Sequence, residues 1–290
     1  MRRLALIVNP SAAGGRATAA LESVRATLAQ HGLEHRVELT RSLEHARELA
    51  LEAAAADEVA VAFGGDGLAA AIAGALKHSE AVLGVLPGGR GNDLARTLGI
   101  PLEPGAACSV LAAGVVRELD LGEVSGRTFI GIASCGFDSD ANRIANATRV
   151  VRGNLVYCYS AVAALARWRP AAFEVELDGE RRAFTGYSVA LANSQSYGGG
   201  MMLAPDASMQ DGLLDVVMIG DVSKARFLAL LPTVFRGAHV RQRNVEIARA
   251  REVEVRAERP FSMYADGDPI ADLPASARAL PGAVKVLVPA

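Results

Sequence analysis

Short apolar runs alternate with segments of helical periodicity over the first hundred residues. The runs read LALIVNP at 4–10, HRVELT at 35–40, EVAVAF at 58–63 and AVLGVLPGG at 81–89. Helical patterns lie between them, over about 16–30, over 42–56 and directly after Asp66. Such alternation is typical of a parallel sheet with helices on both faces, so the pattern predicts an N-terminal α/β domain.

From about Arg117 the chain changes to short runs separated by Gly, Asp and Asn, such as RELDLGEVSG, TFIGIASCGF and AFEVELDGERRAF. A two-residue turn such as Asp178-Gly179 between alternating runs indicates a hairpin, so this half is predicted to be mainly antiparallel sheet. Two helical stretches, at about 153–168 and 223–236, interrupt it. We therefore expect two domains, residues 1–120 and 121–290. Whether the last residues pack back on the first domain stays open.

Composition limits the classes of protein that remain. The 290 residues are 51% hydrophobic and 21% charged, which indicates a substantial core, and the net charge of -2 gives no general attraction to nucleic acid. Three widely spaced cysteines without a C-x-x-C pair argue against a disulfide framework or a zinc knuckle and fit a reducing cytoplasm. The apolar run at the start stops at Asn9, and the uncharged stretch 155–166 is too short to span a bilayer.

A glycine-rich turn around one acid follows the strand EVAVAF. In Gly64-Gly65-Asp66-Gly67 the glycines let the backbone approach a phosphate at a helix N-terminus, and Asp66 would face the same place. A carboxylate there could reach Mg²⁺ or orient an accepting hydroxyl. The alternative is a tight turn in which Asp66 caps the helix.

Two further loops strengthen the phosphate interpretation. LPGGRGNDLART at 86–97 brings Gly89, Arg90 and Asn92 to the start of another helix, and NPSAAGGR offers Arg16 after the first strand. Loops that follow neighbouring parallel strands meet at the carboxyl edge of the sheet, where ligands of α/β proteins bind.

Acids also stand at turns in the second half. Asp211-Gly212 could form a hairpin turn or hold a cation with neighbouring carbonyls. In MYADGDP, Asp266 and Asp268 could include a general base or belong to a solvated turn. The spacing leaves both pairs of alternatives open.

In chain order, the segments VNPSAAGG, GGDG, PGGRGNDLAR, GIASCGFD, NSQSYGGGM, APDASMQDGLLDV and ADGDP resemble the diacylglycerol kinase catalytic-domain family. The resemblance is to its bacterial soluble lipid kinases in particular, which are similar to sphingosine kinases, and it covers nearly the whole chain. It implies a Rossmann-like α/β nucleotide domain, a C-terminal antiparallel β-sandwich domain with the lipid site, and an active site in the cleft between them.

The resemblance also implies roles for single residues. Asp66 matches the position that organises Mg²⁺ and phosphate, and Asp266 and Asp268 match those that supply the base for the lipid hydroxyl. Asp211, with the carbonyls of Ser208 and Leu213, matches a structural cation site. The positions expected to contact the nucleotide are Asn9, Thr40, Gly64, Gly65, Asp66, Gly67, Leu68, Gly89, Arg90 and Asn92.

The chain departs from the family pattern beside the first two loops. Leu68, Ala70 and Ala71 stand where the family has Thr and Asn-Glu after GGDG, and Arg90 replaces a threonine. The leading hypothesis is a kinase that uses ATP and Mg²⁺ on a hydroxyl of a diacylglycerol-like or other long-chain lipid. The alternatives are a catalytically decayed lipid-binding or regulatory protein and an NAD kinase, which shares the GGDG loop.

The stretch SKARFLALLPTVFRGAHVRQR at 223–243 is both apolar and basic. It could lie at an anionic membrane surface, or it could cover one face of the β-sandwich. We expect a cytoplasmic protein with peripheral contact to the inner face of the membrane, acting on a membrane-borne lipid and not on nucleic acid. Whether it is a homodimer stays open.

Overall fold

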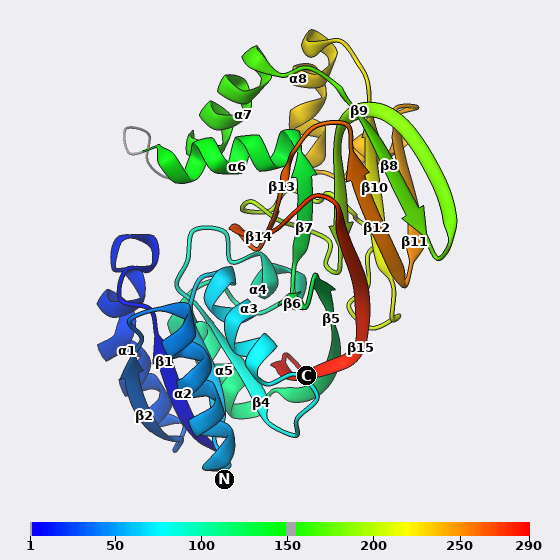
Figure 1. Ribbon diagram of the computed structural model, residues 1–290. Helices are drawn as coiled ribbons and strands as arrows, with labels where there is room; N and C mark the ends of the chain where they lie inside the picture. The colour runs from blue at the N-terminus through cyan, green and yellow to red at the C-terminus, as the bar shows by residue number, and fades with distance from the viewer. Residues whose placement is uncertain (1, 149–154) are drawn as a thin grey trace. The chain divides into compact units, whose positions relative to one another are not determined.

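The computed structural model describes residues 2–148 and 155–290 (Figure 1). The chain divides into two compact units, one made of Met1–Leu121 with Pro281–Ala290 and the other of Gly122–Leu280. The last strand, β15 (Ala275–Val288), contributes residues to both units. Among the described residues, none of the helices is both long and apolar enough to cross a membrane.

The first unit is a parallel sheet with the strand order β2-β1-β3-β4, and the end of β15 joins β4 through the pairs Lys285 with Val82 and Val286 with Leu83. Its strands are β1 (Arg3–Val8), β2 (Glu34–Leu39), β3 (Val59–Gly64), β4 (Val82–Pro87) and β5 (Val115–Val124) as far as Leu121. Its helices are η1 (Ala12–Gly14), α1 (Arg16–Gln30), α2 (Leu43–Ala55), α3 (Asp66–Ala75), α4 (Asp93–Thr97) and α5 (Pro104–Ala113). The α/β architecture predicted for this half is confirmed.

Local sequence explains where these elements begin. Helix α2 starts after Ser42, whose side chain accepts a hydrogen bond from the backbone N–H of His45, a standard N-cap. Helix α1 starts after Gly15, whose φ of 91° suits a residue without a side chain. All six residues of β3 are buried, as expected of a central parallel strand.

The second unit is antiparallel, with the strand order β14-β13-β7-β9-β8-β12-β15, while β10 pairs with both β9 and β11. Its strands are the end of β5 (Val115–Val124), β6 (Arg127–Phe129), β7 (Ile132–Gly136), β8 (Ala171–Leu177), β9 (Glu180–Ala192), β10 (Leu214–Gly220), β11 (Val245–Ala250), β12 (Glu252–Ala257), β13 (Ser262–Ala265), β14 (Asp268–Asp272) and the start of β15. Its helices are α6 (Phe137–Ala147), α7 (Leu155–Arg167), α8 (Lys224–Val234) and η2 (Ala238–Arg241). The predicted β-sandwich-like character of this half is confirmed.

The structure differs from the sequence expectations in two places here. The run TFIGIASCGF forms two strands, β6 and β7, separated at Ile130 and Gly131. Helix α6 was not expected, because its sequence FDSDANRIANA is largely polar and follows a strand pattern directly, although Phe137, Ala141 and Ile144 lie at helical spacing. The helix expected at about 153–168 is α7, and residues 153 and 154 of that stretch lie outside the described part.

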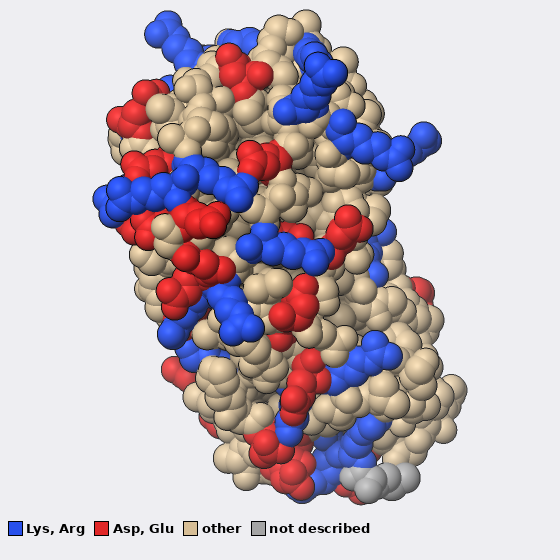
Figure 2. Space-filling view, turned by 90° about the vertical axis from the view of Figure 1, so that its right-hand side faces the viewer, with Lys and Arg blue, Asp and Glu red and all other residues tan. Residues whose placement is uncertain are grey.

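Aromatic rings fill the core of the second unit next to its helices. Tyr187 on β9 and Phe227 on α8 stack with ring centroids 4.2 Å apart, and Phe137 meets Phe227 edge to face at 4.7 Å. On the solvent side of β8, Glu176 pairs with Arg181 at 3.0 Å. Figure 2 shows such basic and acidic side chains interspersed over one face of the molecule.

Candidate active site

Three loops of the first unit follow neighbouring strands at the carboxyl edge of its sheet. The backbone N–H of Asn9, after β1, donates to the carbonyl of Phe63 in β3 at 3.1 Å. The N–H of Gly88, after β4, donates to the carbonyl of Gly64 at 2.7 Å. The backbone hydrogen bonding of the sheet therefore continues into the loops and holds them side by side.

The two glycine loops approach each other more closely than side chains would allow. A Cβ added to Gly89 would lie 2.4 Å from the Cα of Gly65, and one added to Gly88 would lie 2.9 Å from the Cβ of Ala17. Only hydrogen fits at Gly89, so glycine is required there for contact between the loops.

Asp66 joins these loops through its side chain. Its Oδ1 accepts a hydrogen bond of 3.0 Å from the backbone N–H of Leu94, in the first turn of α4. The N-cap of α3 is Gly65, and Asp66 is the first residue of the helix, so the capping alternative does not describe its position. Its carboxylate also lies at the positive end of the α3 dipole.

The environment of Asp66 opposes its ionisation. Burial, together with the negative charge of Asp93, raises its pKa from 3.8 to about 6, and backbone donors including Leu94 N–H only partly offset this. Asp93 is itself buried in the first turn of α4. Sequence reasoning gave Asp93 no role. Its position directly after Asn92, at the start of a predicted helix, was the signal that could have selected it as a site residue.

The other residues of this unit that were predicted to contact the nucleotide also make hydrogen bonds within the protein. Asn92, with φ at 52°, accepts from the N–H of Gly89 at 2.8 Å and donates to its carbonyl at 3.2 Å, which closes the second loop. Asn9 Oδ1 accepts from the backbone N–H of Ser11 at 3.0 Å. Thr40 is buried and donates its hydroxyl hydrogen to the carbonyl of Ser42 at 2.6 Å, so toward a ligand the hydroxyl could only accept.

The residues that depart from the family pattern differ in exposure. Arg90 is exposed, whereas Leu68 is only 2% exposed. A Cβ on Gly64 would lie 2.8 Å from a methyl carbon of Leu68, so this leucine packs directly over the glycine loop. The hydrophobic side chain of Leu68 therefore covers the backbone at Gly64, where the family pattern has the hydroxyl of a threonine.

These residues fit MgATP, which the sequence resemblance implies. The N-terminus of α3 follows the first glycine loop at Gly65, and the Asp66 and Asp93 carboxylates are hard oxygen donors whose mutual repulsion a cation would relieve. Among the described residues, no group of three or more His, Cys, Asp or Glu side chains is arranged to hold a metal alone. Phosphate oxygens and water would therefore have to complete the coordination of Mg²⁺.

In the second unit, Asp266 binds backbone. Its Oδ2 accepts from the N–H of Ile130 and its Oδ1 from the N–H of Gly131, each at 2.9 Å. Asp266 has a φ of 50° and Gly267 one of 96°, so the pair forms the hairpin turn between β13 and β14. Asp266 thereby fixes the break between β6 and β7.

Asp268 has a different environment, two residues along the same hairpin. The residue is exposed, yet desolvation of its carboxyl group raises its pKa, and the positive charge of Arg127 offsets this only in part. A raised pKa brings a carboxylate closer to the range useful for a general base. The two acids of ADGDP are thus not equivalent.

The predicted cation position lies at the start of β10. Asp211 Oδ1 accepts from the N–H of Leu213 at 3.1 Å, and the N–H of Gln210 donates to Ser208 Oγ at 3.2 Å. In this segment, side chains thus accept hydrogen bonds from backbone N–H groups two residues further along the chain. Nearby, the guanidinium of Arg249 bonds the buried carboxylate of Asp215 at 3.1 Å. The Arg249 guanidinium thus places a positive charge beside Asp215.

Asp138, at the start of α6, was given no role by sequence reasoning. Burial raises its pKa from 3.8 to about 6, and the hydroxyls of Tyr197 and Ser188 counter this only in part. Within the described residues its buried Oδ2 has no hydrogen-bond partner. An acid directly after the apolar run TFIGIASCGF was the signal that could have selected it.

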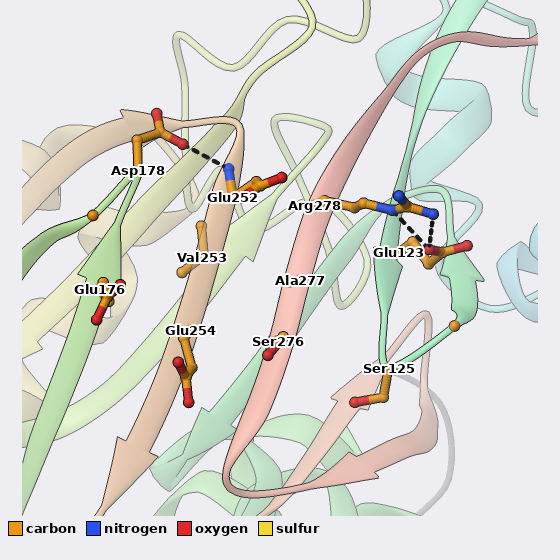
Figure 3. Close-up of a pocket in the computed structure, with 12 residues that line it drawn as sticks. Glu123, Ser125, Glu176, Asp178, Glu252, Val253, Glu254, Ser276, Ala277 and Arg278 are labelled. Carbon is orange, nitrogen blue, oxygen red and sulfur yellow. Dashed lines mark hydrogen bonds and ion pairs between the residues drawn. The ribbon is translucent and has the colours of Figure 1, made fainter.

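A hollow of about 400 Å³ on the second unit contains none of the predicted residues (Figure 3). Several of its charged groups have structural partners. Arg278 bonds Glu123 at 2.7 Å, and Asp178 Oδ1 accepts from the N–H of Glu252 at 2.8 Å, which anchors the turn between β8 and β9. Nothing in the hollow points to chemistry.

Known proteins resemble the whole chain. Residues 3–124 match the family description "Diacylglycerol kinase catalytic domain", and residues 131–288 match "YegS C-terminal NAD kinase beta sandwich-like domain". A protein named diacylglycerol kinase from Mycobacterium tuberculosis is 35% identical over 99% of this chain and 95% of its own length. One of the same name from Bacillus subtilis is 31% identical over 92% of this chain and 90% of its own length.

Two further similarities agree with these. A probable lipid kinase YegS-like from Pseudomonas aeruginosa is 34% identical over 93% of this chain and 90% of its own length. The crystal structure of a putative diacylglycerol kinase from Bacillus anthracis has the same fold, with a TM-score of 0.82 at 20% identity over 99% of this chain and 97% of the other. From these matches we conclude that the chain belongs to the diacylglycerol kinase family, together with the YegS-like lipid kinases.

Proposed function

We propose that the protein is a lipid kinase that uses ATP and Mg²⁺ to phosphorylate a hydroxyl of a diacylglycerol-like or other long-chain lipid. The observation that carries this proposal is the position of Asp66, which faces Asp93 where two contacting glycine loops follow adjacent parallel strands. Phosphoryl transfer requires mainly positioning and charge stabilisation, and such a site can supply both.

In this proposal each part of the first unit has a task. The N-terminus of α3, after the first glycine loop, would bind phosphate through its N–H groups, the exposed Arg90 would add positive charge, and Asn92 holds the second loop closed. Bound Mg²⁺ would neutralise charge on the phosphates. Asp66 must be ionised to bind it, which requires a pH above its raised pKa of about 6.

The base for the lipid hydroxyl is expected from the ADGDP hairpin. Asp266 already accepts two backbone hydrogen bonds, whereas Asp268 is exposed and its pKa is raised. We therefore assign the proton acceptance to Asp268 and the shaping of the hairpin to Asp266. This division makes separate predictions for the two acids.

Leu68 favours a second candidate function. Because it places a buried hydrocarbon side chain over Gly64, a site of this kind could have lost catalysis while the protein still binds lipid. An assay for phosphate transfer from radiolabelled ATP to dispersed lipids distinguishes the candidates. Acceptors would be diacylglycerol, monoacylglycerol and sphingosine, with NAD as a separate arm.

The matched variants are Asp66→Asn and Glu52→Gln, the latter an exposed acid on α2. We expect label in a lipid with the wild-type protein and with Glu52→Gln, and a loss of label with Asp66→Asn. Label in NAD alone would establish the NAD kinase alternative. An absence of label in every acceptor, from a folded protein that still binds lipid, would instead support the non-catalytic candidate.

A further inference from the structure

Arg127 begins β6 directly after a tight turn. Ser125 and Gly126, with φ of 48° and 82°, form the two-residue turn between β5 and β6. Asp268 has the corresponding position on the ADGDP hairpin, as the first residue of β14 after a turn of the same kind. Two-residue turns with positive φ at both positions fix the register of the strands that they join. Arg127 and Asp268 are therefore both held in defined positions by their backbone.

Two side chains tie the ADGDP hairpin to β6 and to the break after it. Nη1 of Arg127 donates to the carbonyls of Pro269 at 3.2 Å and Ile270 at 3.0 Å. These two residues directly follow Asp268. Asp266, two residues before Asp268, accepts from backbone N–H groups at the break between β6 and β7. The hairpin is therefore fixed on both sides of Asp268.

The guanidinium of Arg127 brings a positive charge to this hairpin. The titratable side chains of the hairpin itself, besides Asp268, are Tyr264, Asp266 and Asp272, and none of them is basic. Both acceptors of Arg127 are neutral carbonyl oxygens, so these bonds do not cancel its charge. Desolvation raises the pKa of Asp268, and the charge of Arg127 acts in the opposite direction. Without Arg127 the carboxylate form of Asp268 would lose this support.

We propose that Arg127 is a positioning residue for phosphoryl transfer, which holds the ADGDP hairpin from β6 and keeps Asp268 in the carboxylate form that can take a proton. The inference deepens the proposed function and rests on it, because Asp268 is the proton acceptor there. In the transfer step the lipid hydroxyl oxygen bonds the γ-phosphorus, and the bond from that phosphorus to the leaving ADP oxygen breaks. The hydroxyl proton passes to a carboxylate oxygen of Asp268. Arg127 acts on this step only through Asp268.

Two substitutions separate the charge of Arg127 from its hydrogen bonds. Arg127→Lys keeps the positive charge and the ability to donate to carbonyl oxygens. Arg127→Gln keeps a side-chain N–H donor and removes the charge. The control is Arg181→Gln on β9, which removes an exposed arginine that pairs with Glu176 in the same unit. Arg127 is exposed as well, so each variant is expected to fold.

The pH profile of kcat/KM, measured with a short-chain diacylglycerol as acceptor, is the first readout. On the acidic limb, where the rate rises with pH, Arg127→Gln should lower kcat/KM about three- to tenfold, because a larger share of Asp268 is protonated there. On the alkaline plateau the loss should be less than about twofold. Arg127→Lys and Arg181→Gln should follow the wild type at every pH. Asp66 titrates on the same limb in all four proteins, so they are compared at equal pH.

The second readout needs neither ATP nor lipid. The carboxyl carbon NMR signal of Asp268, assigned by its loss in Asp268→Asn, is titrated with pH in each protein. The pKa of Asp268 should be higher in Arg127→Gln than in the wild type. In an active kinase, an unchanged pKa or an equal loss of rate at every pH would overturn the proposal and leave the proposed function intact. A raised pKa in a protein that phosphorylates no acceptor would confirm the action of Arg127 on Asp268 and remove the kinase function.

Discussion

The carboxylate of Asp66 accepts a hydrogen bond from the backbone N–H of Leu94 at 3.0 Å, across 28 positions of the chain. The bond ties the first turn of α3 to the first turn of α4. The acid of the first glycine loop thus also positions the second, although its own ionisation is disfavoured there.

Asp66→Asn is expected to lower the activity without lowering the stability of the fold. Asparagine keeps an oxygen that can accept from Leu94, but it lacks the negative charge, so kcat should fall about 100-fold or more. Because the native pKa of Asp66 is raised, ionisation costs stability as the pH rises from about 4 through about 6. Above that range the variant should resist urea at least as well as the wild type. A variant that unfolds more easily at about pH 8 would show that the charge stabilises the loops.

Asp138→Asn is expected to change the pH dependence of stability. The pKa of Asp138 is raised from 3.8 to about 6, so its contribution is present below about pH 4 and lost as the pH rises through about 6. About two pKa units at about 1.4 kcal/mol each correspond to about 3 kcal/mol. Urea unfolding of the wild type should show this decline, and Asp138→Asn should remove it. Asp140→Asn, on the same helix with a 39% exposed side chain, is the control and should retain the decline.

The two acids of the ADGDP hairpin should respond differently to amidation. Asp266→Asn leaves one of two backbone donors, at Ile130 or Gly131, facing an NH₂ group, which should lower the free energy of unfolding by about 1–3 kcal/mol. Asp268→Asn is exposed and should change it by less than about 0.5 kcal/mol while lowering kcat. Urea titration and steady-state kinetics of both variants test this. Full activity of Asp268→Asn would remove it as the base.

Leu68→Thr, compared with Leu68→Val, isolates the hydroxyl that the chain lacks. Both changes remove buried hydrocarbon and should lower the free energy of unfolding by about 1–3 kcal/mol. Threonine and valine have nearly the same shape, so the difference between them reports the hydroxyl. One added hydrogen bond to a phosphate should lower KM for ATP about two- to tenfold relative to valine. Equal KM values for the two variants would mean that position 68 does not contact the nucleotide.

Much of the fold could be predicted because its signals are local. The helical pattern over residues 16–30 corresponds to α1, and the turn at Asp178-Gly179 joins β8 to β9 as expected. Helix α6 was missed because its sequence is largely polar and follows a strand pattern directly, although Phe137, Ala141 and Ile144 lie at helical spacing and pack against the core. This apolar face was a local signal that the sequence reasoning did not use.

The sequence predicted which loops form the candidate site, but it did not predict which of their residues contact one another. Glycine content marked both loops, but the contact between Gly65 and Gly89 depends on how two parallel strands are aligned. The partnership of Asp66 with Leu94 and Asp93 follows from that alignment. In the same way, Asp266 could be read as base or turn, because Ile130 and Gly131 reach it only through the pairing of β13 with β7.

The path of β15 determines when, during translation, the sheet of the first unit can be completed. Lys285 and Val286 pair with β4, so this edge of the first unit's sheet stays unpaired until residues that follow the second unit have been synthesised. A nascent chain would therefore hold β4 with an open edge while the whole second unit is translated. Open strand edges promote association between chains. For this protein the interval most vulnerable to misassembly is therefore the translation of the second unit, and it ends when Pro281–Ala290 have been made.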